Sequence, residues 1–270
     1  MAMRPSISDR FPAPSVMGVI NVTPDSFSDA GTYFHVEPAV TAAWGMLEAG
    51  AAIVDVGGES TRPGSDGVTA EEELRRIEPV LAGLAGAPLS VDTSKAVVAR
   101  RALELGVELV NDVTALRADP DLAGVIADAG CYACLMHMQG EPRTMQVNPT
   151  YEDVVSEVKR FLEERLAFAV SEGVSEELVC LDPGIGFGKT VEQNFELVRR
   201  LDELTAIGRP VLVGFSRKSS LAKITGASTG SAAASVGAAV AAYDRGAAIL
   251  RAHDVREHVE ALTAARAVRG

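Results

Sequence analysis

The stretch at 181–189, Leu-Asp-Pro-Gly-Ile-Gly-Phe-Gly-Lys, combines residue types that could bind a ligand. Asp182 follows a short apolar run, Pro183 stops a strand from continuing, and three alternate glycines let the backbone approach a ligand closely. Two nucleotide-binding patterns fail on spacing, because the P-loop needs glycine where Pro183 stands and the dinucleotide fingerprint needs glycine where Lys189 stands. By itself the stretch fits a ligand-binding loop and a simple glycine-rich turn equally well.

Polar residues follow short apolar runs repeatedly along the chain. The runs are 16–20, 52–56, 89–91, 107–110, 132–136, 178–181, 210–213 and 247–250. Helical patterns separate or follow them at 38–49, 71–84, 95–105, 121–129, 151–171, 191–204, 231–243 and 255–268, with Thr69 as an N-cap and Glu72 at capping-box spacing. The nearly continuous apolar character of each run is typical of strands covered on both faces.

Eight strand-helix units of this size predict an α/β fold, a single (β/α)8 TIM barrel with its active site at the C-terminal ends of the strands. An open, doubly wound sheet is the alternative. The length of 270 residues suits one barrel, which typically takes ~250 residues. We expect the barrel to span 16–270 and residues 1–15 to form a flexible N-terminal extension.

Composition restricts the class of protein. An apolar fraction of 47% with 23% charged residues is typical of a globular α/β protein, and the net charge of −12 argues against a nucleic-acid partner. The apolar runs are too short for a membrane span and the first residues lack a signal-peptide pattern, so we expect a cytoplasmic protein without a membrane partner. The odd number of cysteines, Cys131, Cys134 and Cys180, indicates buried thiols rather than a zinc site.

In a barrel, the polar residues at the strand ends would face one mouth. Asp92, Asn111 and Asp182 offer the donors and acceptors that suit a flat, amide-like heterocycle. A second group suits a phosphorylated substrate and its metal: Asn21, Arg62, Arg251 and His253. No motif supplies a nucleophile beside a base, or the His and Cys cluster of a transition-metal site.

Eight ordered motifs carry a family resemblance over the chain from about residue 16 onward. They are Asn-Val-Thr-Pro-Asp-Ser-Phe-Ser-Asp at 21–29, Gly-Gly-Glu-Ser-Thr-Arg-Pro-Gly at 57–64, Val-Asp-Thr at 91–93, Asn-Asp at 111–112, Met-His-Met-Gln-Gly at 136–140, Asp-Pro-Gly-Ile-Gly-Phe-Gly-Lys at 182–189, Gly-Phe-Ser-Arg-Lys-Ser at 214–219 and Arg-Ala-His-Asp-Val at 251–255. This series resembles that of the dihydropteroate synthases, the folate-pathway enzymes that sulfonamides inhibit. Ala30 and Ala252 depart from the family pattern without removing a functional side chain.

The resemblance implies a transferase that condenses hydroxymethyl-dihydropterin diphosphate with para-aminobenzoate, releasing pyrophosphate, with Mg²⁺ as cofactor and a homodimer as the assembly. By motif, the pterin site would be Asp92, Asn111, Val113, Met136, Asp182, Phe187, Gly214 and Lys218. The diphosphate would be bound by Asn21, Arg62, Arg251 and His253, and Asn21 would also coordinate the metal. The para-aminobenzoate site would be Phe27, Asp29, Thr61, Pro63 and Ser219.

The chemistry of these residues favours early departure of pyrophosphate. Cleavage of the carbon–oxygen bond places positive charge on a methylene conjugated to the pterin, and buried carboxylates such as Asp92 and Asp182 can stabilise it. Lys218 and Arg62 complete the expected catalytic set. A neutral aromatic amine needs positioning more than a base. We therefore expect a dissociative path.

Other interpretations stay open for single residues and for the whole chain. Taken singly, Asp92 and Asp182 could cap local structure. We expect His35 and His258 at the surface, Trp44 in the core and His137 as a hydrogen-bonded packing residue. A methyltransferase domain using methyl-tetrahydrofolate would not need the motifs at 61–63 and 216–219, and a catalytically silent paralogue should have lost Asn21, Asp29 or Arg62.

Overall fold

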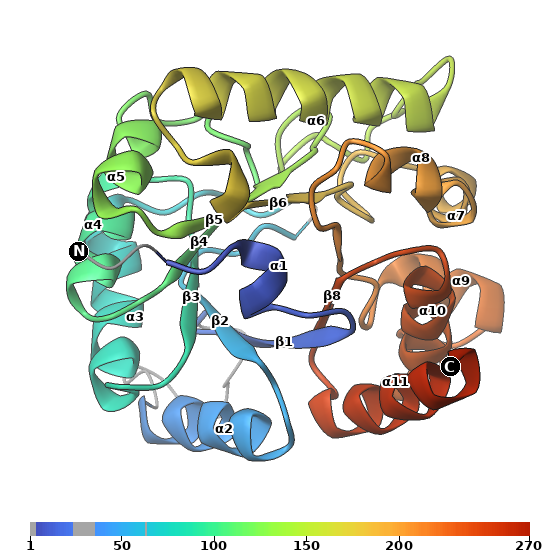
Figure 1. The fold of residues 1–270 in the computed structure, drawn as a ribbon, viewed down its shortest axis with the longest axis horizontal. Helices are drawn as coiled ribbons and strands as arrows, with labels where there is room; N and C mark the ends of the chain where they lie inside the picture. Colours follow the sequence, from blue (N-terminus) through green and yellow to red (C-terminus); the bar gives the residue numbers. More distant parts are fainter. Residues whose placement is uncertain (1–3, 24–35, 63) are drawn as a thin grey trace.

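The eight predicted strands form one parallel sheet that closes on itself (Figure 1). The computed structural model describes residues 4–23, 36–62 and 64–270. The strands are β1 Ser15–Asn21, β2 Ile53–Gly57, β3 Leu89–Asp92, β4 Leu109–Asp112, β5 Tyr132–Met136, β6 Val179–Asp182, β7 Leu212–Val213 and β8 Ile249–Ala252. Their order is β6-β5-β4-β3-β2-β1-β8-β7, and a parallel bridge between Leu181 and Val211 joins β6 to the β7 side. The (β/α)8 barrel is confirmed, and the open sheet is wrong.

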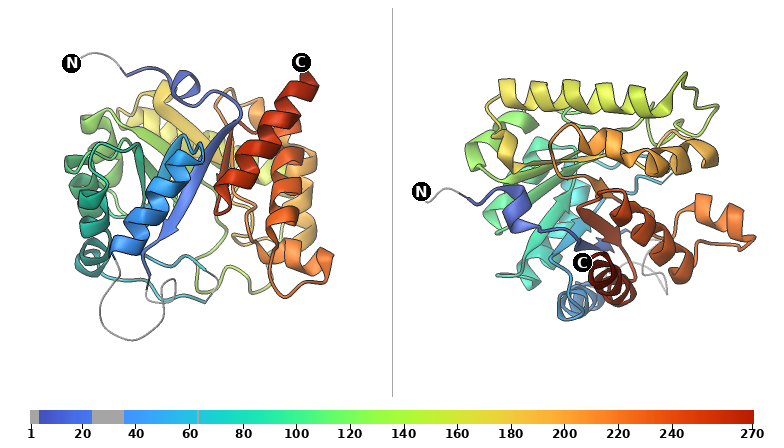
Figure 2. Two further views of the ribbon diagram at one scale, coloured as in Figure 1. Left: turned by 90° about the horizontal axis from the view of Figure 1, so that it is seen from below. Right: turned by 45° about the vertical axis from the view of Figure 1, so that its right-hand side comes forward.

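Helices surround the barrel on its outer face (Figures 1 and 2). They are α2 Val36–Glu48, α3 Ala70–Gly83, α4 Ala96–Glu104, α5 Leu122–Ala129, α6 Val154–Ser171, α7 Val191–Arg199, α8 Leu201–Thr205, α9 Ser219–Thr225, α10 Ala232–Asp244 and α11 Val255–Arg269, with a short 3-10 turn η2 Glu176–Leu178. In the parts of the chain that the structure describes, no helix is both long enough and apolar enough to cross a membrane.

Local capping explains where three helices differ from the pattern. Thr69 caps α3 through a 3.2 Å bond from the Glu72 backbone N–H, as predicted, but the Glu72 carboxylate binds arginines of its own helix instead of completing a capping box. The helix predicted at 151–171 begins at Val154 because Asp153 caps it. The helix predicted at 191–204 breaks at Arg200 into α7 and α8.

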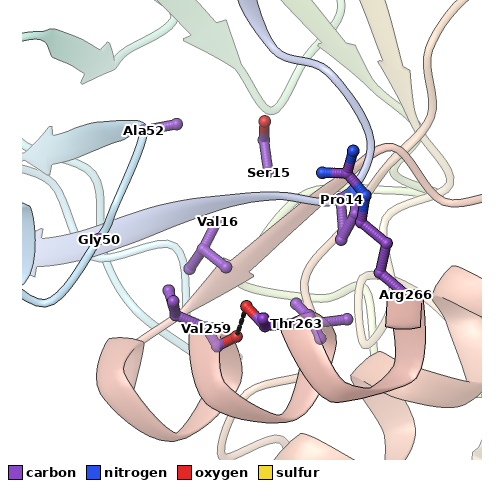
Figure 3. A pocket seen from close by; sticks show the side chains of 9 residues that line it. Pro14, Ser15, Val16, Gly50, Ala52, Val259, Thr263 and Arg266 are labelled. Carbon is purple, nitrogen blue, oxygen red and sulfur yellow. Dashed lines mark hydrogen bonds between the residues drawn. The ribbon is translucent and has the colours of Figure 1, made fainter. Parts of the chain in front are cut away.

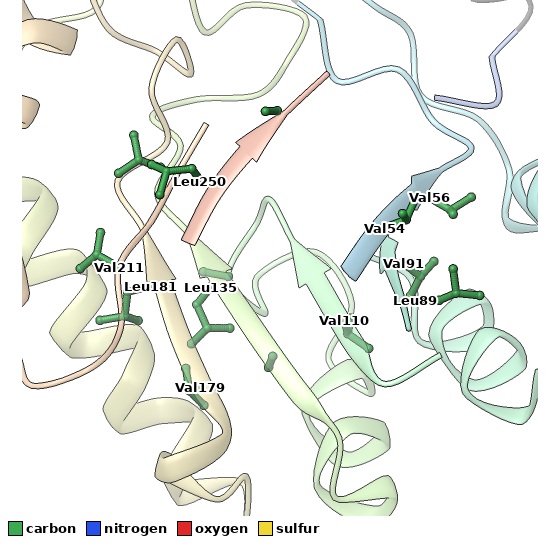
Figure 4. Close-up of a cluster of buried hydrophobic side chains, with 14 of the residues drawn as sticks. Val54, Val56, Leu89, Val91, Val110, Leu135, Val179, Leu181, Val211 and Leu250 are labelled. Carbon is green, nitrogen blue, oxygen red and sulfur yellow. The ribbon is translucent and has the colours of Figure 1, made fainter. Parts of the chain in front are cut away.

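Two rows of side chains leave each strand, as the two-residue period of a strand requires. The outward row is apolar and packs under the helices (Figure 4); it includes Val54, Val56, Leu89, Val91, Val110, Leu135, Val179, Leu181, Val211 and Leu250. The lower part of the inward row is also apolar and fills the barrel; it includes Met17, Ile53, Leu109, Tyr132, Cys134, Cys180, Leu212 and Ile249. The upper part of the inward row is polar, and this difference builds the site.

The N-terminal segment is part of the packed structure, so the prediction of a flexible extension over 1–15 is wrong for its described part. α1 Ile7–Arg10 lies across the end of the barrel where the strands begin (Figures 1 and 2). Ile7 and Phe11 are 0% and 1% exposed and join the apolar layer inside the barrel.

Two predictions about isolated residues are wrong, and one is confirmed. Trp44 is 41% exposed on α2, so the core around that helix is filled without it. His258 is 1% exposed, and its Nδ1 lies 2.6 Å from the Asp254 carbonyl oxygen at the start of α11. The three cysteines are free and buried, as predicted. His35 lies outside the described residues.

Candidate active site

A buried polar layer forms the top of the barrel interior. We call it the floor and define it as Asp55, Ser90, Asp92, Asn111, Asp182 and Arg251. Every member is on a strand, and Asp55, Asn111, Asp182 and Arg251 each lie two residues beyond an apolar residue of the inner layer, whereas Ser90 and Asp92 are successive inward residues of β3. The polar residues that the sequence placed at separate strand ends therefore meet in one place.

Asp55 is the centre of the floor. Its carboxylate is 0% exposed and accepts hydrogen bonds from Ser90 Oγ at 2.6 Å and from Asn111 Nδ2 at 2.9 Å. Arg251 Nε donates to Asp55 Oδ2 at 2.8 Å, while Arg251 Nη2 lies 2.7 Å from Asp55 Oδ2 and 3.0 Å from Asp92 Oδ2. Asp55, Ser90, Asp92, Asn111 and Arg251 thus form a connected network with one guanidinium between two carboxylates, and Asp182 lies outside these bonds.

Burial disfavours the charged form of two floor carboxylates, Asp92 and Asp182. The pKa of Asp92 is raised to about 7, first by burial and then by the neighbouring Asp55 charge, against the opposing effect of Arg251. The pKa of Asp182 is raised to about 6, mainly by burial, although the Gly184 N–H and the nearby Lys218 ammonium favour its charged form. In their charged form, the carboxylates of Asp92 and Asp182 would accept strong hydrogen bonds from the N–H groups of a ring that excludes water.

Lys218 lies beside the floor at the entrance of α9. Its Nζ is 4.4 Å from the centre of the Phe187 ring, a cation–π contact. Burial, followed by repulsion from Arg251, lowers the pKa of Lys218 to about 8. Gly186 packs against the same side chain, because a Cβ there would be 3.3 Å from Lys218 Cδ.

An apolar wall stands next to the floor. It consists of Val113, Met136, Met138, Met145 and Phe187. Gly214 faces Arg251 with space for a Cβ at 3.7 Å. A flat polar floor beside an apolar wall suits a planar heterocycle that hydrogen-bonds along its edge and packs on its face.

His253 lies one inward step beyond Arg251. Its backbone N–H donates to Ser216 Oγ at 3.1 Å, and its Nδ1 is 3.0 Å from the same oxygen. Burial, followed by repulsion from Arg251, lowers the pKa of His253 to about 4, so the ring is neutral near pH 7. The neighbouring Arg217 is held by Asp254 at 2.5 Å.

The outer part of the mouth, which we call the rim, consists of Thr61, Arg62 and Ser219. Arg62 and Ser219 are exposed, and Thr61 is half-buried. The loop bearing Thr61 and Arg62 is anchored from below, where Lys95 Nζ binds Glu59 at 2.5 Å, and beyond it, where the Gly64 N–H donates to the Pro142 carbonyl at 3.0 Å. The rim is thus tied to the connection after β5.

The predicted site residues divide by place. The floor and wall bring together most of those predicted for the pterin, Lys218 lies against Phe187 of the wall, and Gly214 faces Arg251 of the floor. Asn21 ends β1 opposite Gly57 of β2. Arg251, predicted at the diphosphate, is engaged within the floor, and its contact with a diphosphate stays a prediction. Phe27, Asp29 and Pro63 lie outside the described residues.

Asp55 was missed by sequence reasoning, although it carried a signal. It is the one charge inside the apolar run at 52–56, and an isolated carboxylate at an inward strand position must find partners. Asp112 was also missed as an organiser: its buried carboxylate accepts from the backbone N–H groups of Thr114 and Leu116 at 2.8 and 2.6 Å.

In the part of the chain that the structure describes, neither a ready-made metal site nor the cavity at the other end of the barrel competes with this site. Among residues 4–23, 36–62 and 64–270, no group of three or more His, Cys, Asp or Glu side chains could hold a metal ion. A cavity of about 190 Å3 lies at the opposite end of the barrel, between the start of β1 and α11 (Figure 3). Its lining includes Ser15, Thr263 and the exposed Arg266, none of which contacts the floor, so we assign it no role.

Known proteins share both the sequence and the architecture. Residues 17–253 match the family described as pterin binding enzyme. Dihydropteroate synthase of Neisseria meningitidis serogroup C is 47% identical over 258 residues, covering 93% of this chain and 91% of that protein. Dihydropteroate synthase of Xanthomonas albilineans with 4-aminobenzoic acid has a TM-score of 0.90 at 46% identity, covering 96% of this chain and 94% of that one. Its complex with 7,8-dihydropteroate has a TM-score of 0.87 at 43% identity, covering 96% and 95%.

A closed barrel with a polar floor and an apolar wall, matched over most of its length by the pterin-binding family, defines a pterin-binding enzyme. The chain belongs to the dihydropteroate synthase family, a family of transferases. The resemblance based on the eight motifs is thereby confirmed.

Proposed function

We propose that this chain joins hydroxymethyl-dihydropterin diphosphate to para-aminobenzoate, with the pterin on the floor and the amine at the rim. The observation that carries the proposal is the floor, where Asp92, Asn111 and Asp182 present acceptors and donors from neighbouring strand ends, two of them buried and Asp92 nearly so. The apolar wall beside it supplies a surface for the ring face. Complexes of relatives with 4-aminobenzoic acid and 7,8-dihydropteroate support this choice of substrates.

The rim and the end of β1 would hold the charged leaving group. Arg62 is exposed and able to reach outward, and His253 is neutral and can donate a hydrogen bond. Asn21 offers one amide oxygen. Mg²⁺ keeps several waters and commonly binds through one protein ligand plus substrate phosphates, so this sparse donor set fits it. When bound, Mg²⁺ would neutralise charge on the departing pyrophosphate.

We propose a dissociative order of bond breaking. The carbon–oxygen bond between the pterin methylene and the diphosphate breaks first, and its electron pair leaves with pyrophosphate. The floor carboxylates stabilise the resulting cation. The amine nitrogen then forms the new carbon–nitrogen bond and loses a proton. This order is supported by the carboxyl groups of Asp92 and Asp182 where the pterin is proposed to bind, together with the lack of a base poised for the amine among the described residues.

The activity is tested by measuring pyrophosphate release from purified protein given the pterin diphosphate, Mg²⁺ and para-aminobenzoate. We expect release that needs both substrates and stops when a chelator removes Mg²⁺. Methyl transfer from methyl-tetrahydrofolate, without pyrophosphate release, would instead support the methyltransferase alternative. Binding of the pterin without turnover would support a silent paralogue.

The order of steps is tested with heavy oxygen at the bridging position of the pterin diphosphate. The enzyme is incubated with this substrate and Mg²⁺ but without para-aminobenzoate. We expect the label to move into non-bridging positions or pyrophosphate to appear. If neither occurs in a preparation that turns over normally with both substrates, direct displacement by the amine replaces the dissociative order.

The assembly and the compartment are further proposals. We propose a homodimer, as the family resemblance implies, and a cytoplasmic location, as the short apolar runs and the first residues of the sequence indicate. Light scattering on the purified protein measures the assembly directly, and fractionation of cells that express the chain measures its location. A monomeric mass, or recovery with membranes, would contradict the respective proposal.

A further inference from the structure

Lys189 is a buried charge that the proposed function leaves without a role. Its residue is 2% exposed at the end of the 181–189 stretch. Lys189 Nζ lies 2.9 Å from His137 Nδ1, 3.0 Å from the Gly184 carbonyl oxygen and 2.9 Å from the Phe187 carbonyl oxygen, with the His137 carbonyl oxygen at 3.4 Å. A buried lysine with so many partners organises the groups around it.

The loop that Lys189 holds is packed tightly on the connection after β5. Gly184 and Gly188 have φ angles of +66° and +64°, which favour glycine. A Cβ at Gly184 would lie 1.9 Å from the His137 carbonyl oxygen, and one at Gly188 would lie 2.5 Å from the Gln139 carbonyl oxygen. Lys189 therefore bonds the loop at 184–188 to His137 at the end of β5, where the two backbones are too close for a side chain between them.

The same loop presents two parts of the pterin site. The Gly184 N–H donates to Asp182 Oδ1 at 2.7 Å, so Gly184 is bonded to Lys189 on its carbonyl side and to the floor on its amide side. Phe187, whose carbonyl also accepts from Lys189, places its ring 4.4 Å from Lys218 Nζ. Movement of Lys189 would thus disturb a floor carboxylate and the apolar wall together.

The partners of Lys189 require its charged form. His137 is neutral, because burial, followed by the nearby charge of Lys189, lowers its pKa to about 2, and its Nδ1 accepts from Lys189 in the tautomer that carries the proton on Nε2. Three acceptors within 3.0 Å match the three N–H groups of an ammonium, whereas a neutral amine donates only two.

The charge of Lys189 is finely balanced. Burial lowers the pKa of Lys189 to about 7, the Asp182 carboxylate opposes that fall, and the Lys218 ammonium adds to it. The charge of Arg117, in the connection after β4, also lowers the pKa of His137. The charge of Arg251, on β8, lowers the pKa of Asp182. Lys189 and Asp182 consequently stabilise each other's charges.

We propose that Lys189, held by His137, is a positioning residue that fixes Gly184 and Phe187 and keeps the Asp182 carboxylate charged for the pterin. It does not touch the substrate itself. This inference rests on the proposed role of Asp182 in pterin binding. It adds to the site two residues, one from the β5 end and one from the β6 loop, that act through their neighbours.

The test compares Lys189→Met, which keeps the length and removes the charge, with Lys223→Met on the exposed face of α9 as the matched control. Pterin affinity is measured by calorimetry with the pterin diphosphate from about pH 5 to about pH 8, alongside the KM for para-aminobenzoate. We expect Lys189→Met to weaken pterin binding about tenfold at neutral pH, because a charge-assisted contact is lost. The acid-side midpoint of pterin binding should move to higher pH, and the KM for para-aminobenzoate should change less than about twofold.

A second pair of variants keeps the inference testable if Lys189→Met does not fold. His137→Asn retains an acceptor where Nδ1 stands, and His137→Leu removes it. We expect His137→Asn to bind the pterin nearly as the parent does, and His137→Leu to weaken it with the same upward movement of the midpoint.

Two results would overturn the inference. Equal loss for both substrates with an unmoved midpoint would show that Lys189 supports only the fold. Unchanged pterin affinity in a folded Lys189→Met protein would show that the loop needs no lysine. Either result leaves the proposed function intact, because the parent protein would still bind the pterin and release pyrophosphate; a parent that binds no pterin would overturn both.

Discussion

The floor and the rim lie at the same mouth but are built in different ways. Every floor residue is on a strand, and Asp55 and Asn111 are 0% and 4% exposed and joined to their neighbours by side-chain hydrogen bonds. The rim residues are on loops or at a helix start, and Arg62 and Ser219 are exposed. Substitution of a floor residue therefore leaves a buried polar group without a hydrogen-bond partner. Substitution of a rim residue leaves its former partner hydrogen-bonded to water.

This difference separates rigid recognition from adaptable contact. Buried hydrogen bonds to charged groups are costly to leave unmade, so the floor should bind one ring in one orientation. Side chains at the rim are hydrated when no substrate is bound, so leaving them unpaired costs little free energy. They can also change position as charge develops on the leaving group during the reaction. The comparison predicts large effects on affinity from the floor and effects on turnover from the rim.

The largest expected effect comes from Asp182→Ala. Loss of a buried charged acceptor should weaken pterin binding by about 3 kcal/mol, or about a hundredfold. Asp182→Asn is the matched control, because its oxygen can still accept from the Gly184 N–H and hold the loop. Calorimetric titration checks both variants, with circular dichroism to confirm folding. An unaltered affinity in folded Asp182→Ala would remove Asp182 from the pterin site.

A smaller effect, on the fold itself, is expected from Asp55→Asn. The new amide would set an N–H group against Arg251 or Asn111, and Arg251 would keep only Asp92 as a counter-charge. We expect the free energy of unfolding to fall by about 2 kcal/mol, less than for a buried charge left wholly unpaired. Urea denaturation measures this, and Thr61→Ala at the rim should change it by less than about 0.5 kcal/mol. Similar losses at both positions would erase the distinction between floor and rim.

The strand ends were predictable because a parallel barrel fixes where they meet. Once eight parallel strands close into a barrel, a polar residue at the C-terminal end of a strand, such as Asp92 or Asn111, must lie at the same mouth as the others. Asp55 was not identified, because its partner Arg251 is 196 residues away in sequence. Likewise Ile7 and Phe11 enter the barrel through packing that no local pattern encodes.

The third prediction concerns pH, where stability and affinity should change in opposite directions. Asp182 and Asp92 have raised pKa values of about 6 and about 7, mainly because of burial, whereas both would titrate near about 3.9 in the unfolded chain. The folded protein holds these protons more tightly, so their contribution to the free energy of unfolding is lost as pH rises from about 4 through these values.

Pterin affinity should instead rise, by about fivefold between about pH 5 and about pH 7, because only the charged carboxylate can accept on both oxygens. Urea denaturation and calorimetry in the same buffers check the two directions. Asp182→Asn should reduce both profiles to the part that Asp92 contributes, and Arg62→Ala should leave both unchanged. Parallel pH profiles in the parent would mean that the floor carboxylates do not receive the pterin.

The smallest expected effect on pterin affinity is that of Arg62→Ala, and its comparison with Lys218→Ala sharpens the division between rim and floor. Lys218 lies beside the buried carboxylates and over the Phe187 ring, so its removal should damage both pterin binding and turnover. Arg62 is exposed and should interact most strongly once charge develops on the departing pyrophosphate. We expect Arg62→Ala to change pterin affinity by less than about twofold while lowering kcat by a larger factor. Steady-state kinetics with calorimetry on both variants separates the two roles. Indistinguishable profiles would mean that the exposed rim and the buried floor act on the substrate as one unit.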